Sequence, residues 1–519
     1  MLPTLIWTLL SSSSLLLCNK SNRHLLMEGK RETIILFPFM AQAHITPFLA
    51  LSFRIAEKGS YNIILVNTPL NIKKLRSSLP PKYSSIRLLE IPFDGTEHGL
   101  PPDAETADIL PYDVGLRLLE LSPSLEPAFR ALLSDVIREQ GGLRPLCVVA
   151  DFFFGWTAAV AREFGIFHAI FSGAGAFGLA CFYSMWLSLP HRDSGEVEFT
   201  LPDFPEAGVF HVTQLSPSLA VADGADRFSV FQRKNLPTWA DSNGLLLNTI
   251  AELENNGLVY FRRKLNVPVW AIGPILLSED DRARIRAGKE FGISPEECTK
   301  WLDKKPESSV LYISFGSQST ISATQMMQLA KALDSTDRNF IWVIRPPLGF
   351  DPAADFSPEE WLPEGFIERV NARETGLIVL NWAPQVEILA HSSIAAFLSH
   401  CGWNSVLESL CNGVAFIGWP MAAEQFFNAK LLGEEVGVCV EVARGTNFEV
   451  RWSDIVEKIE LVMGESEKGK EIRRKAMEVK EIIRNAGRDE EGCKGSSVIA
   501  MEEFLKAAEM MKERVEIGR

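Results

Sequence analysis

The sequence predicts an α/β protein with two doubly wound parallel-sheet domains that face one another across a cleft. Short apolar segments alternate with longer amphipathic stretches, as buried parallel strands alternate with the helices that cover them. The alternation pauses once, over the charged residues 267–297. The length of 519 residues allows two domains of ordinary size on either side of this pause.

The apolar segments that predict strands are rich in β-branched and aromatic residues. In the first half they are Thr33–Phe39, Ile63–Asn67, Ile86–Ile91, Cys147–Asp151 and Leu245–Asn248. In the second half they are Val310–Phe315, Phe340–Arg345, Leu377–Leu380, Ala395–Ser399, Ala415–Trp419 and Val438–Val442. Thr249 and Glu252 have the spacing of a capping box, which predicts a helix directly after the fifth segment.

The same pattern gives the domain boundaries. Residues 1–26 are expected to lie outside the fold, because their Ser-rich apolar run is too short for a membrane span and lacks the basic residues that begin a signal peptide. We expect an N-terminal domain over 27–266, a linker over 267–297, a second domain over 298–495 and a C-terminal helix over 496–519. No other segment predicts a membrane span.

Charge and cysteine content exclude several classes of function. The 66 acidic residues outnumber the 52 basic ones, and the net charge of −14 argues against binding nucleic acid or an anionic membrane. The eight cysteines are scattered and form no CxxC pair, so neither a disulfide framework nor a zinc site is indicated. We expect a cytoplasmic monomer with reduced thiols.

The richest loop follows the segment Ala395–Ser399. There His400, Asn404 and Ser405 lead into an amphipathic stretch that predicts a helix. The free N–H groups and positive dipole of a helix N-terminus bind an anion without net basic charge. Glu408, on the opening turns, could accept hydrogen bonds from the two hydroxyls of a ribose. The alternative is an ordinary capped helix.

Two flanking pieces favour a nucleotide sugar. Upstream, Trp382 could stack on a base and Gln385 could bond its edge, although a lone Trp is more often a core residue. Downstream, Glu424 and Gln425 follow a predicted strand and could hold the hydroxyls of a sugar.

Residues 382–425 closely resemble the 44-residue signature box of the plant family-1 UDP-glycosyltransferases, which act on secondary products and have the GT-B fold. The elements WAPQ, HCGWNS, LES, P and EQ fall in the register of the box. The resemblance continues over nearly the whole chain from Met27, and the opening MEGKRETIILFPFMAQAHITPFLAL is similar to the UDP-glycosyltransferase 92A group. It implies a hexosyltransferase with two Rossmann-like domains. The N-terminal domain, 27–266, would bind the acceptor, and the C-terminal domain, 298–495, would bind the UDP-sugar.

The resemblance also implies a role for each residue of the donor site. Uracil would stack on Trp382 and contact Ala383 and Gln385, and Glu408 would hold the ribose. The diphosphate would be bound by His400, Asn404, Ser405 and Ser317, and the sugar by Trp403, Glu424 and Gln425. Gln at the last box position is associated in the family with glucose, so UDP-glucose is the expected co-substrate and no further cofactor is expected. The sequence has no Asp-x-Asp pair for a metal ion.

The catalytic pair is expected from the N-terminal half. His44 follows the first predicted strand, where the first loop would face the cleft, and Asp151 ends the strand Cys147–Asp151. Alone, such a His is more often structural and such an Asp a turn residue. By the resemblance, His44 takes the proton of the acceptor hydroxyl and Asp151 fixes its tautomer, so that the anomeric carbon inverts. Ala43 stands where the family has Gly.

Two other functions are compatible with parts of the sequence. The segment Gly173–Gly178 is a literal GxGxxG and suggests an NAD(P)-binding oxidoreductase, but it lies mid-domain and no strand ending in an acid follows about twenty residues on. A non-catalytic sugar-nucleotide-binding protein predicts the loss of His44 or Asp151, and both are present.

The acceptor is expected to be a small lipophilic molecule, with phenolics, terpenoids and hormones all compatible. The candidate pocket residues, each of which could equally belong to the core, are Phe39, Met40, Phe152, Phe153, Phe154, Trp156, Phe177 and Trp186.

Overall fold

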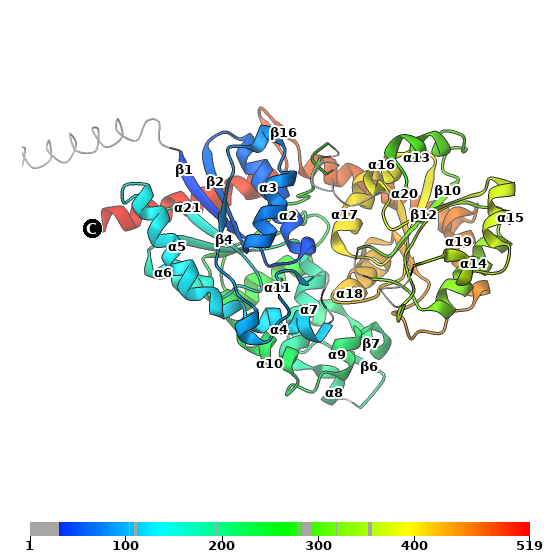
Figure 1. The fold of residues 1–519 in the computed structure, drawn as a ribbon, viewed down its shortest axis with the longest axis horizontal. Coiled ribbons are helices and arrows are strands. Elements are labelled where there is room, and N and C mark those ends of the chain that lie inside the picture. The colour runs from blue at the N-terminus through cyan, green and yellow to red at the C-terminus, as the bar shows by residue number, and fades with distance from the viewer. Residues whose placement is uncertain are drawn as a thin grey trace, which may run out of the picture.

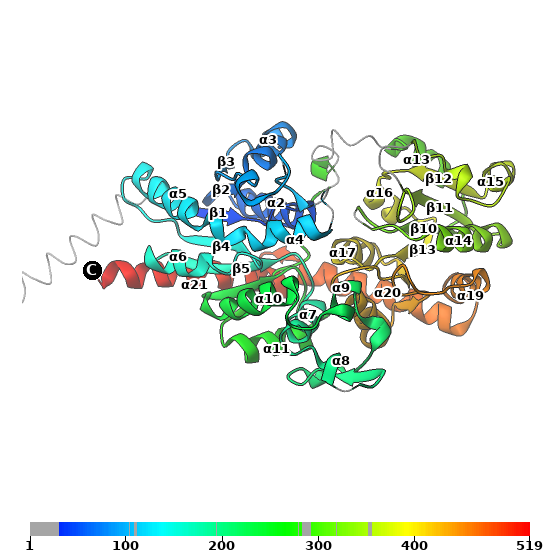
Figure 2. The ribbon, with the colours of Figure 1, turned by 60° about the horizontal axis from the view of Figure 1, so that its bottom comes forward.

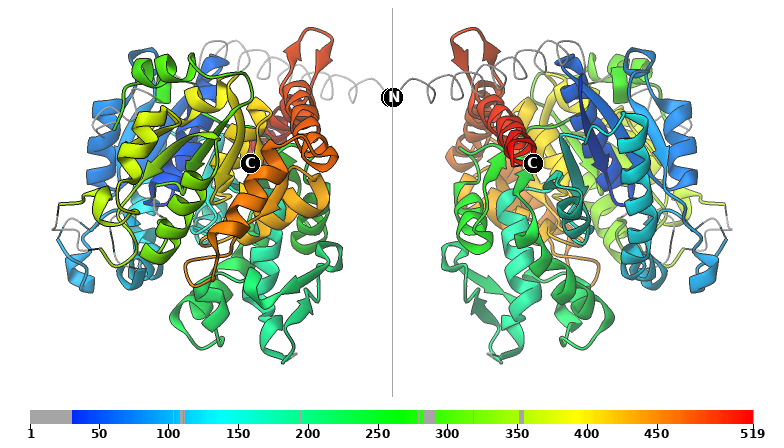
Figure 3. Two further views of the ribbon diagram at one scale, coloured as in Figure 1. Left: turned by 90° about the vertical axis from the view of Figure 1, so that its right-hand side faces the viewer. Right: turned by 90° about the vertical axis from the view of Figure 1, so that its left-hand side faces the viewer.

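The computed structural model describes residues 31–518 except 103, 108, 109, 111, 194, 279, 283–291, 318 and 351–354. The predicted extension over 1–26 lies outside the described residues. Two domains, each with a parallel sheet between layers of helices, lie side by side in Figure 1, and Figure 3 shows helices on both faces of the sheet in the C-terminal domain. The predicted fold class is confirmed.

The N-terminal sheet has seven parallel strands in the order β3-β2-β1-β4-β5-β8-β9. They are β1 Glu32–Phe37, β2 Tyr61–Asn67, β3 Arg87–Glu90, β4 Cys147–Asp151, β5 Phe167–Ser172, β8 Gly244–Leu247 and β9 Val269–Ala271. The chain order runs outward in both directions from the pair β1–β4. This is the switch point of the sheet, where the loops after the two strands diverge and leave a binding crevice.

The helices of this domain cover both faces, and a short hairpin, β6 Glu198–Thr200 and β7 Val209–His211, extends toward the C-terminal domain. They are α2 Gln42–Glu57, α3 Pro69–Ser78, α4 Tyr112–Glu120, α5 Glu126–Glu139, α6 Thr157–Glu163, α7 Ala176–Ser188, α8 Pro190–Asp193, α9 Pro217–Val221, α10 Arg227–Asn235 and α11 Asn255–Leu265.

The capping box predicted at Thr249 is wrong, because α11 begins only at Asn255. The residues after β8 are held instead by the connection between the domains. Gly273 donates its N–H to the carbonyl of Thr249, and Ile275 donates to the side-chain oxygen of Asn248. The segment after β8 is therefore held by hydrogen bonds from residues 273 and 275, more than twenty positions further along the chain, and not by a capping box.

The C-terminal sheet has six parallel strands in the order β12-β11-β10-β13-β14-β15. They are β10 Val310–Ser314, β11 Asn339–Ile344, β12 Gly376–Leu380, β13 Ile394–Ser399, β14 Ala415–Gly418 and β15 Cys439–Glu441. The helices are α13 Pro295–Leu302, α14 Ala323–Ser335, α15 Phe366–Arg373, α16 Gln385–Ala390, α17 Trp403–Asn412, α18 Gln425–Lys430, α19 Trp452–Met463 and α20 Glu467–Ala486. Every predicted strand of both domains is present to within two residues.

Part of the segment predicted as a linker belongs to the N-terminal sheet. The segment predicted as a linker from residue 267 contains β9, which pairs with β8, so the N-terminal sheet continues to Ala271. The predicted helix at the C-terminus is α21 Ser496–Ile517, which follows the small hairpin of β16 Asp489–Glu490 and β17 Cys493–Lys494. Figure 2 shows α21 returning along the N-terminal domain, where Phe504 packs on Phe167 and Trp270.

A cavity of about 810 Å³ lies where the chain passes between the domains. Its walls come from the second half of α2, from residues 274–278 of the connection, from the end of α20 and from the start of α21. No helix in the described part of the chain is long and apolar enough to cross a membrane.

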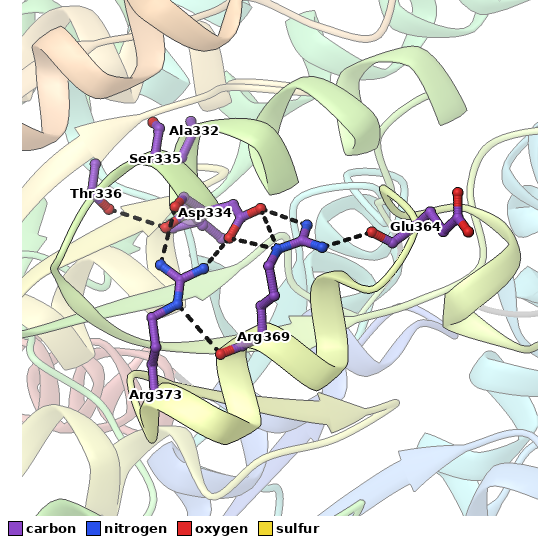
Figure 4. Close-up of polar contacts among 8 residues, drawn as sticks. Ala332, Asp334, Ser335, Thr336, Glu364, Arg369 and Arg373 are labelled. Atoms are coloured by element: carbon purple, nitrogen blue, oxygen red, sulfur yellow. Dashed lines mark hydrogen bonds and ion pairs between the residues drawn. The ribbon is translucent and has the colours of Figure 1, made fainter.

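One surface ion network joins α14 to α15, and Figure 4 shows its two arginines bracketing one carboxylate. Asp334 accepts from Arg369 at 3.0 and 2.6 Å, and its other oxygen is paired with Arg373. The hydrogen bonds from Arg369, followed by those from Arg373, hold the pKa of Asp334 below its ordinary value of 3.8.

We predict that Asp334→Asn lowers the melting temperature by about 2 °C at neutral pH, because two half-exposed arginines lose their common partner. The lowered pKa stabilises the fold above the ordinary value and ceases to do so as Asp334 is protonated. The difference from wild type should therefore shrink in acid. Asp337→Asn, an exposed neighbour, is the control in the same thermal melts, and an equal shift in both would contradict the assignment.

Candidate active site

The pairing of β1 with β4 brings His44 and Asp151 together. Phe37 and Ala150 are register partners, so the residues that follow the two strands leave the same edge of the sheet. Nδ1 of His44, in the first turn of α2, lies 2.8 Å from Oδ2 of Asp151. Asp151 is 1% exposed, and its other oxygen accepts the N–H of Phe153 at 3.0 Å. A carboxylate only accepts, so the neutral imidazole carries its proton on Nδ1 and takes up another on Nε2.

Aromatic rings surround the imidazole of His44, which keeps 19% of its surface exposed. The ring centroids of Phe39, Phe152 and Phe153 lie 5.2–5.5 Å away. Ala43 belongs to α2 and adopts a helical conformation, so the absence of Gly there requires no strain. Of the other candidate acceptor residues, Phe154, Phe177 and Trp186 are core residues.

The loop after β13 carries the residues predicted to bind the diphosphate. Cys401 has a positive φ of 61°, and Gly402 caps α17 without any side-chain hydrogen bond. The first main-chain bond of the helix runs from Val406 to Gly402, so the N–H groups of Trp403, Asn404 and Ser405 precede the helical ladder. Because β13 is next to β10, the loop with Ser317 leaves the same edge, and Ser317 is exposed there.

His400 lies between two glycines of these loops. A Cβ atom on Gly316 or on Gly402 would come 2.6 or 2.4 Å from its Nε2, so both positions need glycine. Burial lowers the pKa of His400 to about 4, which leaves the ring neutral near pH 7. Its Nδ1 has no hydrogen-bond partner among the described residues.

The side chains predicted to bind uracil and ribose form hydrogen bonds with one another. The amide nitrogen of Gln385 donates to Oγ of Ser405 at 3.0 Å and to Glu408 at 2.7 Å. The second oxygen of Glu408 is paired with Arg282, and both side chains are 6% exposed. Arg282 was missed from the sequence, because an arginine in a charged connection is normally solvated. Trp382, half-buried, and Ala383, buried, follow β12.

Trp403 joins the two domains. Its indole N–H donates to the main-chain oxygen of Asn248, after β8, at 2.7 Å. A Cβ on Gly175 would come 2.7 Å from its ring, so the indole lies directly over the start of α7. The resemblance implies that Trp403 contacts the sugar. In the structure, its indole N–H instead forms a hydrogen bond between the two domains.

The GxGxxG segment opens α7, and its helix N-terminus is already occupied. The carboxylate of Glu254 accepts the N–H groups of Ala176 and Phe177, each at 2.9 Å. These are the N–H groups that a dinucleotide pyrophosphate would need. The arrangement therefore argues against NAD(P) binding at this segment.

Glu424 and Gln425 lie where α18 begins. The side-chain oxygen of Gln425 accepts the N–H groups of Met421 and Ala422 at 3.0 and 2.9 Å, so its NH₂ group is the part able to serve a ligand. Burial raises the pKa of Glu424, and hydrogen bonds from its own main chain and from Asn428, followed by the charge of His44, oppose the rise. Nowhere in the described ranges do three or more His, Cys, Asp or Glu side chains gather closely enough to hold a metal ion.

Comparison with known proteins agrees with this geometry. The model of the family described as UDP-glucoronosyl and UDP-glucosyl transferase matches residues 269–474. UDP-glycosyltransferase 92A1 from Arabidopsis thaliana is 51% identical over 486 residues, which cover 92% of this chain and 97% of that relative. The chain belongs to the UDP-glycosyltransferase family. The resemblance to the 92A group is confirmed, and the protein is an enzyme, a glycosyltransferase.

A second curated relative and a solved structure are also similar to this glycosyltransferase. Crocetin glucosyltransferase 3 from Crocus sativus is 40% identical, over 90% of this chain and 97% of the relative. The crystal structure of UGT73P12 from Glycyrrhiza uralensis, complexed with glycyrrhetinic acid 3-O-monoglucuronide, matches with a TM-score of 0.78 at 27% identity. That match covers 94% of this chain and 98% of the solved one, so the GT-B architecture extends over both domains.

We predict that Glu254 makes the stability of this glycosyltransferase depend on pH. Burial raises its pKa to about 7 from an ordinary 4.5, so the folded chain keeps a proton that the unfolded chain releases. The free energy of unfolding should then fall as the pH rises from about 4.5 to about 7. Glu254→Gln should remove this part of the slope in urea titrations between pH 5 and 8. The exposed Glu252→Gln is the control, and an unaltered slope in Glu254→Gln would refute the prediction.

Proposed function

We propose that this glycosyltransferase moves glucose from UDP-glucose to a hydroxyl, or a carboxyl, of a small lipophilic plant metabolite, with inversion at the anomeric carbon. The observation that carries the proposal is the His44–Asp151 pair, 2.8 Å apart, in a chain whose other domain presents the uncapped start of α17. Glucose as the sugar is supported by Gln425 and by the name of the crocetin glucosyltransferase.

On the acceptor side, Nε2 of His44 takes the proton of the attacking hydroxyl. Asp151 holds the ring through Nδ1 and stabilises the imidazolium that forms, at a position that is itself almost fully buried. The hydroxyl oxygen then bonds to the anomeric carbon while the bond to the diphosphate breaks on the opposite face. The product of an α-linked donor is a β-glucoside.

On the donor side, the developing charge of UDP meets the N–H groups at the start of α17. This terminus carries a positive dipole end, and the neutral His400 adds one further N–H. We propose that no metal ion or other cofactor takes part, and the support is this set of protein donors. Glu408 would bind the ribose hydroxyls once its pairing with Arg282 is exchanged for them.

The acceptor would lie against the rings of Phe39, Phe152 and Phe153, beside the base. These rings favour a flat or largely apolar molecule, such as a phenolic or a terpenoid. The chain supplies both halves of the site, which supports a monomer. The described cysteines are all free thiols, which supports a place in the cytoplasm.

The function is tested with protein that begins at Met27 and a panel of phenols and terpenoids, read by mass spectrometry. UDP-glucose should give a product heavier by one hexose with at least one acceptor, and faster than UDP-galactose does. Binding of UDP-glucose in calorimetry without transfer to any acceptor would favour the alternative, a sugar-nucleotide-binding protein without activity.

We predict that His44→Ala lowers kcat by about 10²–10⁴-fold, because the proton of the acceptor hydroxyl loses its base. The affinity for UDP should stay within a factor of about two, since the nucleotide contacts belong to the other domain. Asp151→Asn should also lower kcat by holding the wrong tautomer. The measurements are steady-state kinetics and calorimetry with UDP, and wild-type activity in His44→Ala would remove the base assignment.

A further inference from the structure

Asn428 is a fully buried amide at the domain interface, three residues beyond the signature box. It lies in α18 and is 0% exposed. A buried amide is costly unless its polar atoms are paired, so its contacts show what it holds in place.

Its nitrogen joins two parts of the donor site. Nδ2 donates to the main-chain oxygen of Cys401 at 3.0 Å and approaches an oxygen of Glu424 at 3.4 Å. Both partners only accept, so the nitrogen must face them and the oxygen must face the opposite way. One side chain therefore links the loop that starts α17 to the carboxylate assigned to the sugar.

The bond to Cys401 acts on a strained peptide. A φ of 61° is uncommon for a residue with a side chain and persists where the surroundings impose it. In a trans peptide the C=O and N–H groups point in opposite directions. By holding the oxygen of Cys401, Asn428 thus fixes the direction of the Gly402 N–H, at the entrance to the anion-binding turn.

The oxygen of Asn428 faces the other domain. It has no hydrogen-bond partner among the described residues, and a Cβ on Gly178 of α7 would come 2.1 Å from it. The same Cβ would lie 3.5 Å from Cγ of Glu424. Only glycine at 178 lets α7 pack against this amide.

We propose that Asn428 is a positioning residue of the donor site, which orients the Cys401–Gly402 peptide and Glu424 together, and that α7 holds it in place through Gly178. The inference rests on the proposed donor site. It also gives the GxGxxG segment a role that does not involve a dinucleotide or a sugar. The last glycine of the segment, Gly178, is the residue that packs against the amide of Asn428.

Asn428→Ala should weaken UDP binding about tenfold in calorimetry, because the diphosphate loop loses the bond that orients it. The KM for UDP-glucose should rise by a similar factor, while the KM for the acceptor at saturating donor stays within twofold. A purely structural residue would lower the melting temperature and leave the UDP affinity and the two KM values unchanged, and that result would overturn the proposal.

Gly178→Ala tests the same contact from the other domain, at a residue to which no role in binding either substrate is assigned. The added methyl should displace the amide and weaken UDP binding as Asn428→Ala does. In the Asn428→Ala background the methyl meets no oxygen, so the double variant should bind UDP as the single Asn428 variant does. Fully additive losses would contradict the coupling.

The control is Gly115→Ala in α4, where a Cβ would meet nothing within 4 Å, and it should bind UDP as wild type does. The UDP measurements do not depend on turnover. If wild type binds UDP but transfers no glucose, the proposed function fails while the inference about Asn428 is still decided. If wild type binds UDP and neither variant differs from it, the inference alone fails.

Discussion

The hydrogen bond from the indole of Trp403 to the main chain of Asn248 joins the two domains beside the candidate site. Trp403 is also the first residue of α17, so the helix whose N-terminus is proposed to bind the diphosphate is attached directly to the loop after β8. In the proposed function, the distance between the base and the leaving group depends on this attachment. Gly175 makes it possible, because any side chain there would displace the indole.

The N-termini of α7 and α17 lie close to this bond, and they differ in whether a side chain accepts their N–H groups. Glu254 fills the start of α7, whereas no side chain caps α17. Two uncompensated positive ends at one place would repel one another and would offer an anion two competing positions. The carboxyl group of Glu254 already accepts the N–H groups at the start of α7, so of these two helix ends only the start of α17 leaves its N–H groups available to a diphosphate.

The strands and the loop around His400 could be predicted from neighbouring residues, whereas contacts between residues far apart in the sequence could not. The strands are continuous apolar runs, and the donor loop is a compact group of residues around His400, so both could be predicted. The pairing of Glu408 with Arg282, the use of the Trp403 indole and the contact of Asn428 with Gly178 join residues 126, 155 and 250 positions apart. Neither periodicity nor spacing contains such contacts. The strands β5 and β9 were not among the predicted segments of the two sheets, and β9 has only three residues, which are too few to show a pattern.

The return of α21 to the N-terminal domain means that the chain passes between the domains twice, once after β9 and once after α20. Two attachment points restrain the relative position of the domains more than a single linker would. The cavity of about 810 Å³ is lined by residues of both passages. A break of the main chain in one passage would therefore leave the two domains joined by the other.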